Sequence, residues 1–335
     1  MPGLARPIAL WAWRRATSNQ ADGIPAPRVR WAPRVLAAAQ VAADHAELWP
    51  PAALAALSAI GWLPFVLAVA PLPSEGDLAF VASSIVLSPS FPLNIVLPGA
   101  ALLCVALSAS VLSAAGEVAL LRAIDRLRGL APGSRSIDEA AARAWLIRIV
   151  ASLPALAAAV AVLAVVSGVA PGEYQSPDLG QGPFLVRLAR DVWPLLVLEV
   201  AAIVIGQAFA AGAMRASVGP QSISVGRALS AGLRGLRRRP LRRIAIAVGT
   251  DAALAAWLVV SWALLRVLWT PIGRQAEDGA LLTPASAALL VGFVAIWLCL
   301  VAGGGVLHAW SSTWWSLEDP PGIGERREGG GERWT

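Results

Sequence analysis

Five polar side chains interrupt long apolar stretches of the sequence, where only a few chemical roles are open to them. They are Glu117, Glu199, Gln207, Asp251 and His308. An ionisable group at the centre of a membrane helix costs about 2.5–3.5 kcal/mol on insertion scales, so it usually faces a bundle interior or water. Two interpretations follow. Either Glu117, Asp251 and His308 contact protons or a substrate in a polar cavity, or they hydrogen-bond neighbouring helices together.

The position of each polar residue within its stretch favours a common layer for four of the five. Glu117, Gln207, Asp251 and His308 all fall in the half that the arginine pattern described below places toward the cytoplasm. Glu199 falls in the other half of its stretch. We therefore expect any cavity to open toward the cytoplasm.

Few other residues could catalyse a reaction or bind a metal. The chain has two histidines and two cysteines, and Cys104 and Cys299 lie in apolar stretches where a thiol packs as a small apolar group. There is no phosphate-binding loop, nucleophile elbow, zinc-protease motif or dinucleotide fingerprint. The sequence therefore predicts no cofactor, no metal site and no enzyme. A membrane-embedded lipid enzyme would need Glu117, Asp251 and His308 to converge within hydrogen-bond reach.

The composition indicates that lipid surrounds most of the chain. Of 335 residues, 57% are hydrophobic and 14% are charged, whereas soluble domains average roughly 25% charged residues. A membrane helix needs about 20 apolar residues. Six stretches meet that length, at about residues 51–71, 95–121, 149–170, 192–214, 244–269 and 285–310. The predicted fold is an all-α membrane protein with six transmembrane helices in one domain, residues 34–317.

The arginines predict the orientation of these spans. All 27 positively charged side chains are arginine, and 23 of them lie in the two termini and in the links between spans two and three and between spans four and five. Positive residues concentrate on the cytoplasmic side of membrane proteins. Both termini are therefore predicted to be cytoplasmic, in a bacterial inner membrane. Residues 1–33 and 318–335 are predicted to be disordered cytoplasmic tails.

A weak internal repeat accompanies the spans. The sequences Gly133-Ser134-Arg135-Ser136-Ile137 and Gly219-Pro220-Gln221-Ser222-Ile223 each precede a short amphipathic segment and then a span, and residues 34–48 have the same character before the first span. Ser136 with Glu139 forms a capping box, and Ser222 or Ser224 could cap the matching helix. The pattern predicts cytoplasmic surface helices before spans one, three and five and a threefold repeat of helical hairpins.

A resemblance to a known group appears in the second of these connectors. The stretch Ser222-Ile-Ser-Val-Gly-Arg-Ala-Leu-Ser-Ala-Gly-Leu-Arg-Gly-Leu-Arg-Arg-Arg-Pro240 resembles a connector of bacterial six-helix integral membrane proteins. Their best-named relative is the membrane domain associated with glycerophosphodiester phosphodiesterases. The resemblance covers roughly residues 34–317 and implies a six-helix membrane fold. The hydrolase activity of that group lies in a separate soluble domain, so the resemblance implies no catalytic residue here.

The same connector holds the densest positive charge in the chain. Its arginines are Arg234, Arg237, Arg238, Arg239, Arg242 and Arg243. Each basic residue near the inner leaflet contributes about 1 kcal/mol of attraction to anionic lipid. We expect these side chains to contact anionic headgroups. No nucleic-acid-binding module surrounds them.

Three functions remain open at this point. The first is a non-enzymatic accessory protein that interacts with lipid or with a partner, which could be another protein or a second copy of the chain. The second is a small transporter or permease subunit that uses the buried acids Glu199 and Asp251. The third is the membrane-embedded lipid enzyme described above.

Overall fold

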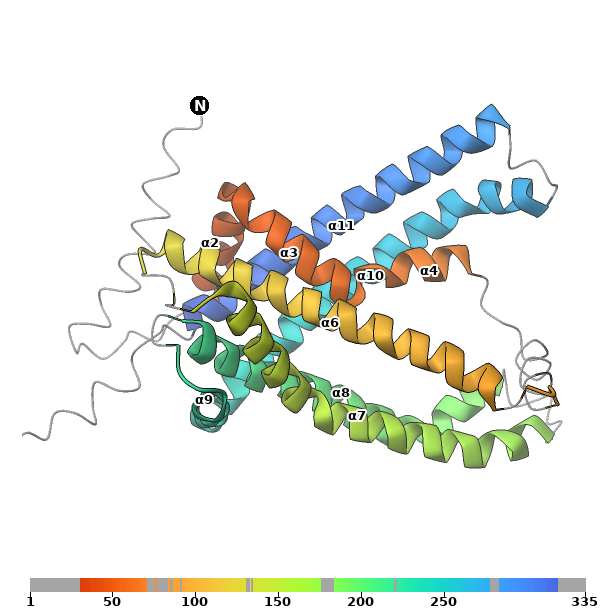
Figure 1. Cartoon of the computed structure of the whole chain (residues 1–335), viewed down its shortest axis with the longest axis horizontal. Helices are drawn as coiled ribbons and strands as arrows, with labels where there is room; N and C mark the ends of the chain where they lie inside the picture. Colours follow the sequence, from red (N-terminus) through yellow and green to blue (C-terminus); the bar gives the residue numbers. More distant parts are fainter. Residues whose placement is uncertain are drawn as a thin grey trace, which may run out of the picture.

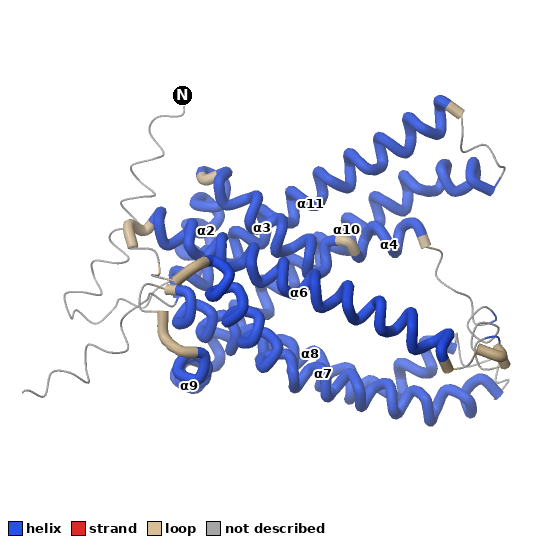
Figure 2. Tube along the Cα trace, viewed as in Figure 1, coloured by secondary structure: helices blue, strands red, loops and turns tan. Residues whose placement is uncertain are grey.

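Helices make up nearly all of the described structure. The computed structural model describes residues 31–70, 76, 84, 87–90, 92–130, 133, 135–175, 184–219, 222–277 and 283–318. Within these residues there is no strand (Figure 2). The elements are α2 (Trp31–Asp44), η1 (Ala46–Leu48), α3 (Trp49–Ala56), η2 (Leu57–Gly61), α4 (Leu63–Val69), α6 (Leu93–Leu127), α7 (Ile137–Gln175), α8 (Phe184–Val218), α9 (Val225–Arg238), α10 (Pro240–Glu277) and α11 (Pro284–Glu318).

Five of the described helices, α6, α7, α8, α10 and α11, are long and apolar enough to cross a membrane. They contain the second to sixth predicted spans, which confirms a helical protein with several membrane-compatible helices. The first predicted span is different, because Ala46–Gly61 and Leu63–Val69 meet at an angle of 45°. Counting this bent pair as one span would give six.

The bend in the first span has a local cause. Residues Leu57–Gly61 form a π-helical turn, η2, and Trp62 follows in a turn conformation. Pro64 then stands in the first turn of α4. Proline has no N–H with which to continue the preceding helix, and it is tolerated in the first turn of a new one, so α4 starts as a separate helix.

The helices form a closed ring in chain order. The α3–η2–α4 segment contacts α6, which contacts α7, then α8, α10 and α11, and α11 returns to α3. The short connections between consecutive long helices make them antiparallel neighbours. The ring leaves one central region that all six helical segments face.

The predicted surface helices are only partly as expected. Helices α2 and α9 are separate short helices, and α2 packs on α11 whereas α9 packs on α8. The predicted segment before the third span is instead continuous with it, because α7 runs unbroken over Ile137–Gln175. The threefold repeat is therefore not confirmed.

The predicted helix starts also differ in detail. The backbone N–H of Glu139 donates to Ser136 Oγ at 3.2 Å, as in a capping box. The Glu139 carboxylate, however, pairs with Arg135 and Arg143. Ser224 is the residue that precedes α9, but its side chain makes no capping hydrogen bond. Helix α2 begins at Trp31, and the other residues of the predicted tails, 1–30 and 319–335, lie outside the described residues.

One end of the ring is densely packed, and we call it the arginine-rich end. It comprises the C-terminal halves of α6, α8 and α11, the N-terminal halves of α7 and α10, and the helices α2, α3 and α9 (Figure 1). Three of the clusters of buried apolar side chains lie here. Helix backbones also approach closely: a Cβ built on Gly206 would lie 2.5 Å from the carbonyl oxygen of Ala151, and one on Gly305 would lie 2.8 Å from Ala53 Cβ.

The opposite end is splayed. Helices α4, α10 and α11 lean one way while α6, α7 and α8 lean the other (Figure 1). Ala68, Leu265, Ile272 and Phe293 form a buried cluster within the first group, and the partly buried Phe65 packs against it. Many large apolar side chains elsewhere at this end are exposed to the surroundings, such as Leu163 at 67%. Such a surface is suited to lipid rather than to water.

Candidate functional site

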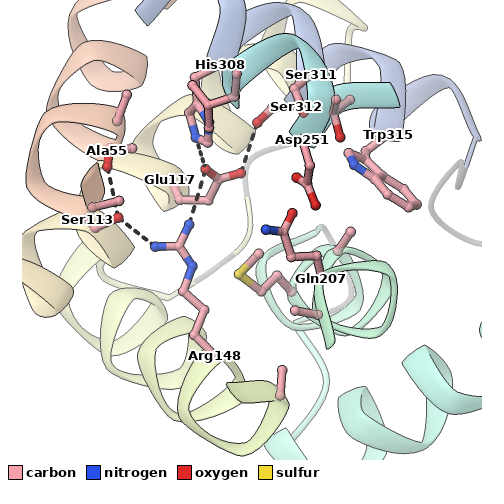
Figure 3. Close-up of a pocket in the computed structure, with 18 of the residues that line it drawn as sticks. Ala55, Ser113, Glu117, Arg148, Gln207, Asp251, His308, Ser311, Ser312 and Trp315 are labelled. Atoms are coloured by element: carbon pink, nitrogen blue, oxygen red, sulfur yellow. Dashed lines mark hydrogen bonds and ion pairs between the residues drawn. The ribbon is translucent and has the colours of Figure 1, made fainter. Parts of the chain in front are cut away.

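A cavity of about 420 Å³ lies inside the ring. Residues from α3, η2, α6, α7, α8, α10 and α11 line it, so each segment of the ring contributes to its wall. Most of this wall is apolar, and the polar side chains are gathered in one layer (Figure 3). A concave apolar site with a few placed polar groups is the usual form of a small-molecule site.

The polar layer arises from a common position along the helices. Glu117 and His308 lie ten residues from the end of α6 and α11, and Arg148, Gln207 and Asp251 lie eleven residues from the arginine-rich end of α7, α8 and α10. At 1.5 Å per residue, that distance is roughly 15–17 Å along each helix. Five helices therefore present a polar residue to the cavity at the same depth.

The carboxylate of Glu117 is the centre of the first polar group. His308 Nε2 lies 2.5 Å from Glu117 Oε2, Arg148 Nη2 lies 3.5 Å from the same oxygen, and Ser312 Oγ donates to Oε1 at 3.1 Å. The Glu117 side chain is only 7% exposed. A buried carboxylate requires charge partners and hydrogen bonds of this kind, and here both of its oxygens have them.

The same group ties two more helices to α6. Arg148 Nη1 donates to Ser113 Oγ at 2.8 Å, and Ser113 Oγ donates to the carbonyl oxygen of Ala55 at 3.0 Å (Figure 3). The chain of contacts thus runs from α3 through α6 and α7 to α11. It holds four of the six ring segments at one level.

The second polar group lies on the other side of the cavity. Asp251 projects from α10, and the side chain of Gln207 from α8 lies beside its carboxylate (Figure 3). The indole of Trp315 on α11 borders the same space. Asp251 Oδ2 is buried and has no hydrogen-bond partner. This carboxylate is therefore far less compensated than that of Glu117.

Four of the five predicted polar residues line this one cavity: Glu117, Gln207, Asp251 and His308. Glu199 does not line it. It lies eight residues from Gln207 along α8, toward the opposite end, and its Oε2 is also buried without a partner. Glu117 and His308 contact each other directly, whereas no contact between either of them and Asp251 is found among the described residues.

The predicted lipid-contacting arginines divide into three kinds: exposed, paired with Glu318, and buried. Arg234, Arg237 and Arg238 are exposed on α9. Arg239 and Arg242 pair with Glu318 at 3.8 and 2.5 Å, and Arg34 pairs with the same carboxylate at 2.8 Å.

Arg243 does not fit the expectation of lipid contact. Its side chain is directed inward, where its guanidinium packs against Gly212 and Gly235. Nη1 donates to the carbonyl oxygen of Ala208 at 3.5 Å, and the residue is 4% exposed. A buried guanidinium cannot reach a headgroup, so Arg243 serves the contact between α8, α9 and α10.

The sequence analysis missed three members of the Glu117 group. Ser113 lies four residues before Glu117, and Ser312 lies four residues after His308, so each shares a helix face with a predicted residue. That spacing could have identified both. Arg148 was interpreted only as a topology signal, although it stands at the start of a predicted span where its side chain can turn inward.

Asp125 and Arg215 form a further buried pair that was not predicted. Their nearest charged atoms are 3.6 Å apart, and both side chains are less than a tenth exposed. Arg215 also borders the cavity. The pair joins α6 to α8 on the arginine-rich side of the polar layer.

Within the described residues, no group of three or more His, Cys, Asp or Glu side chains could hold a metal ion. Comparison with known protein families, curated proteins and solved structures finds no match. The resemblance to the membrane domain associated with glycerophosphodiester phosphodiesterases therefore stays a prediction.

Proposed function

We propose that this chain is a multi-pass inner-membrane protein of six spans, with the bent α3–η2–α4 segment as the first span and both termini in the cytoplasm. The uneven distribution of arginines supports the orientation. The large apolar side chains exposed on α6, α7, α8 and α10 support a lipid environment. Fluorescent-protein fusions to the C-terminus, which fluoresce in the cytoplasm only, test the orientation. A dark, stable fusion would contradict it.

Within that frame, the protein is a non-enzymatic accessory protein that binds an amphipathic small molecule, such as a single-chain lipid, in the central cavity. One observation carries this function: four polar residues predicted from sequence line a single apolar cavity inside the ring. An apolar wall suits the chain of such a ligand, and the polar layer suits its head. The exposed Arg234, Arg237 and Arg238 on α9 are suited to anionic headgroups at the membrane surface.

Photolabelling of the full chain in phosphatidylcholine nanodiscs tests this function. The probe is a single-chain alcohol with a diazirine in its alkyl chain. Ala253 lines the cavity, whereas its neighbour Ala252 is exposed and does not. We expect Ala253→Phe to reduce labelling of cavity-lining peptides at least fivefold, because its ring projects into the space that the ligand would occupy, and Ala252→Phe to leave it unchanged. Equal labelling in both variants contradicts the function.

Transport is the second candidate function, and the irregular, bent helix of the first span favours it. The π-helical turn η2 contributes Ala59 and Ile60 to the cavity wall, and the span bends 45° directly after it. Irregular helical turns are frequent at functional sites and could let one wall move. Uptake by proteoliposomes, compared between the wild type and Asp251→Asn, tests this function. Full uptake by the variant would remove Asp251 from the pathway.

A lipid-hydrolysing reaction receives less support. Both oxygens of Glu117 are already engaged by His308, Arg148 and Ser312, which favours a role in holding the helices together. An acid–base pair for catalysis would need Asp251 at hydrogen-bond distance from His308 or Glu117. This hypothesis required Glu117, Asp251 and His308 to lie within hydrogen-bond reach of one another, and only Glu117 and His308 do so among the described contacts.

A further inference from the structure

The charges that border the cavity are balanced everywhere except at Asp251. Glu117 is compensated by Arg148 and His308, and Arg215 by Asp125. For Asp251, no ion pair with a cationic side chain is found in the part of the chain that the structure describes. Asp251 is therefore the one acid bordering the cavity for which no cationic partner is found among the described residues.

The surroundings of Asp251 make an uncompensated charge costly. Its Oδ2 is buried without a hydrogen-bond partner, in a wall that is otherwise largely apolar. A buried carboxylate oxygen without a partner favours a counter-charge beside it. A proton or a bound cation could supply it.

The shape and chemistry of the wall favour a bound organic cation. Ala253 and Leu254 of α10 and Ile203 and Ala211 of α8 line the same cavity as Asp251. The indole of Trp315 borders the same space (Figure 3), and an aromatic face attracts ammonium groups within about 6 Å of its centre. Among the described residues, no group of three or more His, Cys, Asp or Glu side chains could hold a metal ion here.

We propose that Asp251 is the cation subsite of this cavity and that its ligand is an organic monocation with an apolar body, such as an alkylammonium. Asp251 neutralises the ammonium group, Gln207 and Trp315 contact it, and the apolar wall holds the alkyl body. This inference rests on the proposed binding function and specifies the charge of its ligand. A cavity of about 420 Å³ accommodates a molecule of that kind.

Three photoactivatable probes with the same diazirine alkyl chain test the charge preference. Their heads are trimethylammonium, a neutral hydroxyl and sulfate, and each is applied to the full chain in neutral phosphatidylcholine nanodiscs. We expect the wild type to be labelled in the cavity at least tenfold more by the ammonium probe than by the neutral one, and least by the sulfate. Labelling of lipid-exposed peptides corrects for the amount of each probe in the bilayer.

Two matched variants assign the preference to one residue. Asp251→Asn keeps the shape of the side chain and removes its charge, so it should label equally with the ammonium and neutral probes. Glu199→Gln removes an acid of α8 that lies outside the cavity and whose Oε2 is buried, and it should keep the wild-type preference. The unchanged neutral labelling of Asp251→Asn also verifies that this variant folds.

Other outcomes separate the two proposals. Equal labelling of the wild-type cavity by all three probes means that a proton compensates Asp251, which overturns the cation subsite while leaving the binding function intact. A preference that survives in Asp251→Asn overturns it as well. Cavity labelling that is absent for every probe, or insensitive to Ala253→Phe, overturns the binding function itself.

Discussion

Ile147 is fully buried near the arginine-rich end of α7, whereas Leu163, sixteen residues further along the same helix, exposes 67% of its surface. Both residues belong to one continuous apolar helix, so composition does not distinguish the two ends. Packing does. At the arginine-rich end the helices are joined by buried charges, side-chain hydrogen bonds and close backbone contacts, whereas at the opposite end α6, α7 and α8 diverge from α10 and α11 (Figure 1).

This contrast has a physical explanation. Lipid tails are as apolar as leucine, so apolar side chains gain little by leaving lipid for a helix interface. Polar contacts and close packing of small residues must therefore hold membrane helices together. In this protein both are concentrated at one end, and substitutions there should have the larger effects.

The largest expected loss follows from Glu117→Ala. This change leaves Arg148 and His308 without their shared carboxylate, and breaking a buried charge pair typically costs about 3–5 kcal/mol. We expect that decrease in the free energy of unfolding, measured by chemical denaturation in detergent micelles. Glu117→Gln, which keeps the hydrogen bond from Ser312, should recover part of it. A loss below about 1 kcal/mol for Glu117→Ala would refute the assigned role of the carboxylate.

The next largest difference is expected within α7 itself. Ile147→Ala opens a void that lipid cannot fill, at a cost of about 2 kcal/mol or more. Leu163→Ala changes an exposed side chain and should alter the free energy of unfolding by less than about 0.5 kcal/mol. Both values come from the same denaturation measurement. Similar losses for the two variants would mean that the ends of the ring are equally packed.

Glu318 tests how far the arginine-rich end depends on ion pairs between distant segments. Its carboxylate accepts from Arg34 on α2 and pairs with Arg242 on α10, and its side chain is 3% exposed. We expect Glu318→Gln to cost about 1.5–3 kcal/mol, the usual value of a hydrogen bond to a charged group. Faster amide hydrogen exchange in α2 would identify the helix that is released. Unchanged exchange there would argue against a tie through Arg34.

The smallest expected effects on stability come from two glycine-to-alanine substitutions, and they should have opposite signs at the two ends of the ring. A Cβ on Gly206 would overlap the carbonyl oxygen of Ala151, so Gly206→Ala should destabilise the protein by about 1–3 kcal/mol. Gly292, near the opposite end of α11, has no atom within 4 Å of the same position. Gly292→Ala should be neutral or stabilising by up to about 1 kcal/mol, since alanine favours helix. Thermal denaturation of the two variants side by side compares them.

The sequence was sufficient for the features that depend on local composition. Apolar length predicted the long helices α6, α7, α8, α10 and α11, and polar interruptions predicted Glu117, Gln207, Asp251 and His308 as candidates for one cavity. These predictions succeeded because a buried polar group within a long apolar helix has few alternatives to the bundle interior.

The features that were missed depend on how the helices rotate and end. Arg243 points inward and Arg148 contacts Glu117 because of how α10 and α7 are rotated about their axes in the bundle. The sequence of a single helix does not determine that rotation. The continuity of α7 was missed because Ala-rich segments favour helix on both sides of the expected boundary. The bend after η2 was missed because apolar length alone predicts one continuous span over residues 51–71, whereas Pro64 stands in the first turn of a second helix.

The π-helical turn at Leu57–Gly61 has a consequence for insertions and deletions in this chain. Such a turn holds one residue more than an α-helical turn, which shifts the angular phase of all later side chains by roughly 100°. Beyond it, Phe65 meets the rings of Phe293 and Trp297 at 5.4 and 5.0 Å, and Ala68 is fully buried. Deleting Ala59 would regularise the helix yet turn both residues away from α10 and α11. The extra residue is thus what sets the rotation of the first span against its neighbours.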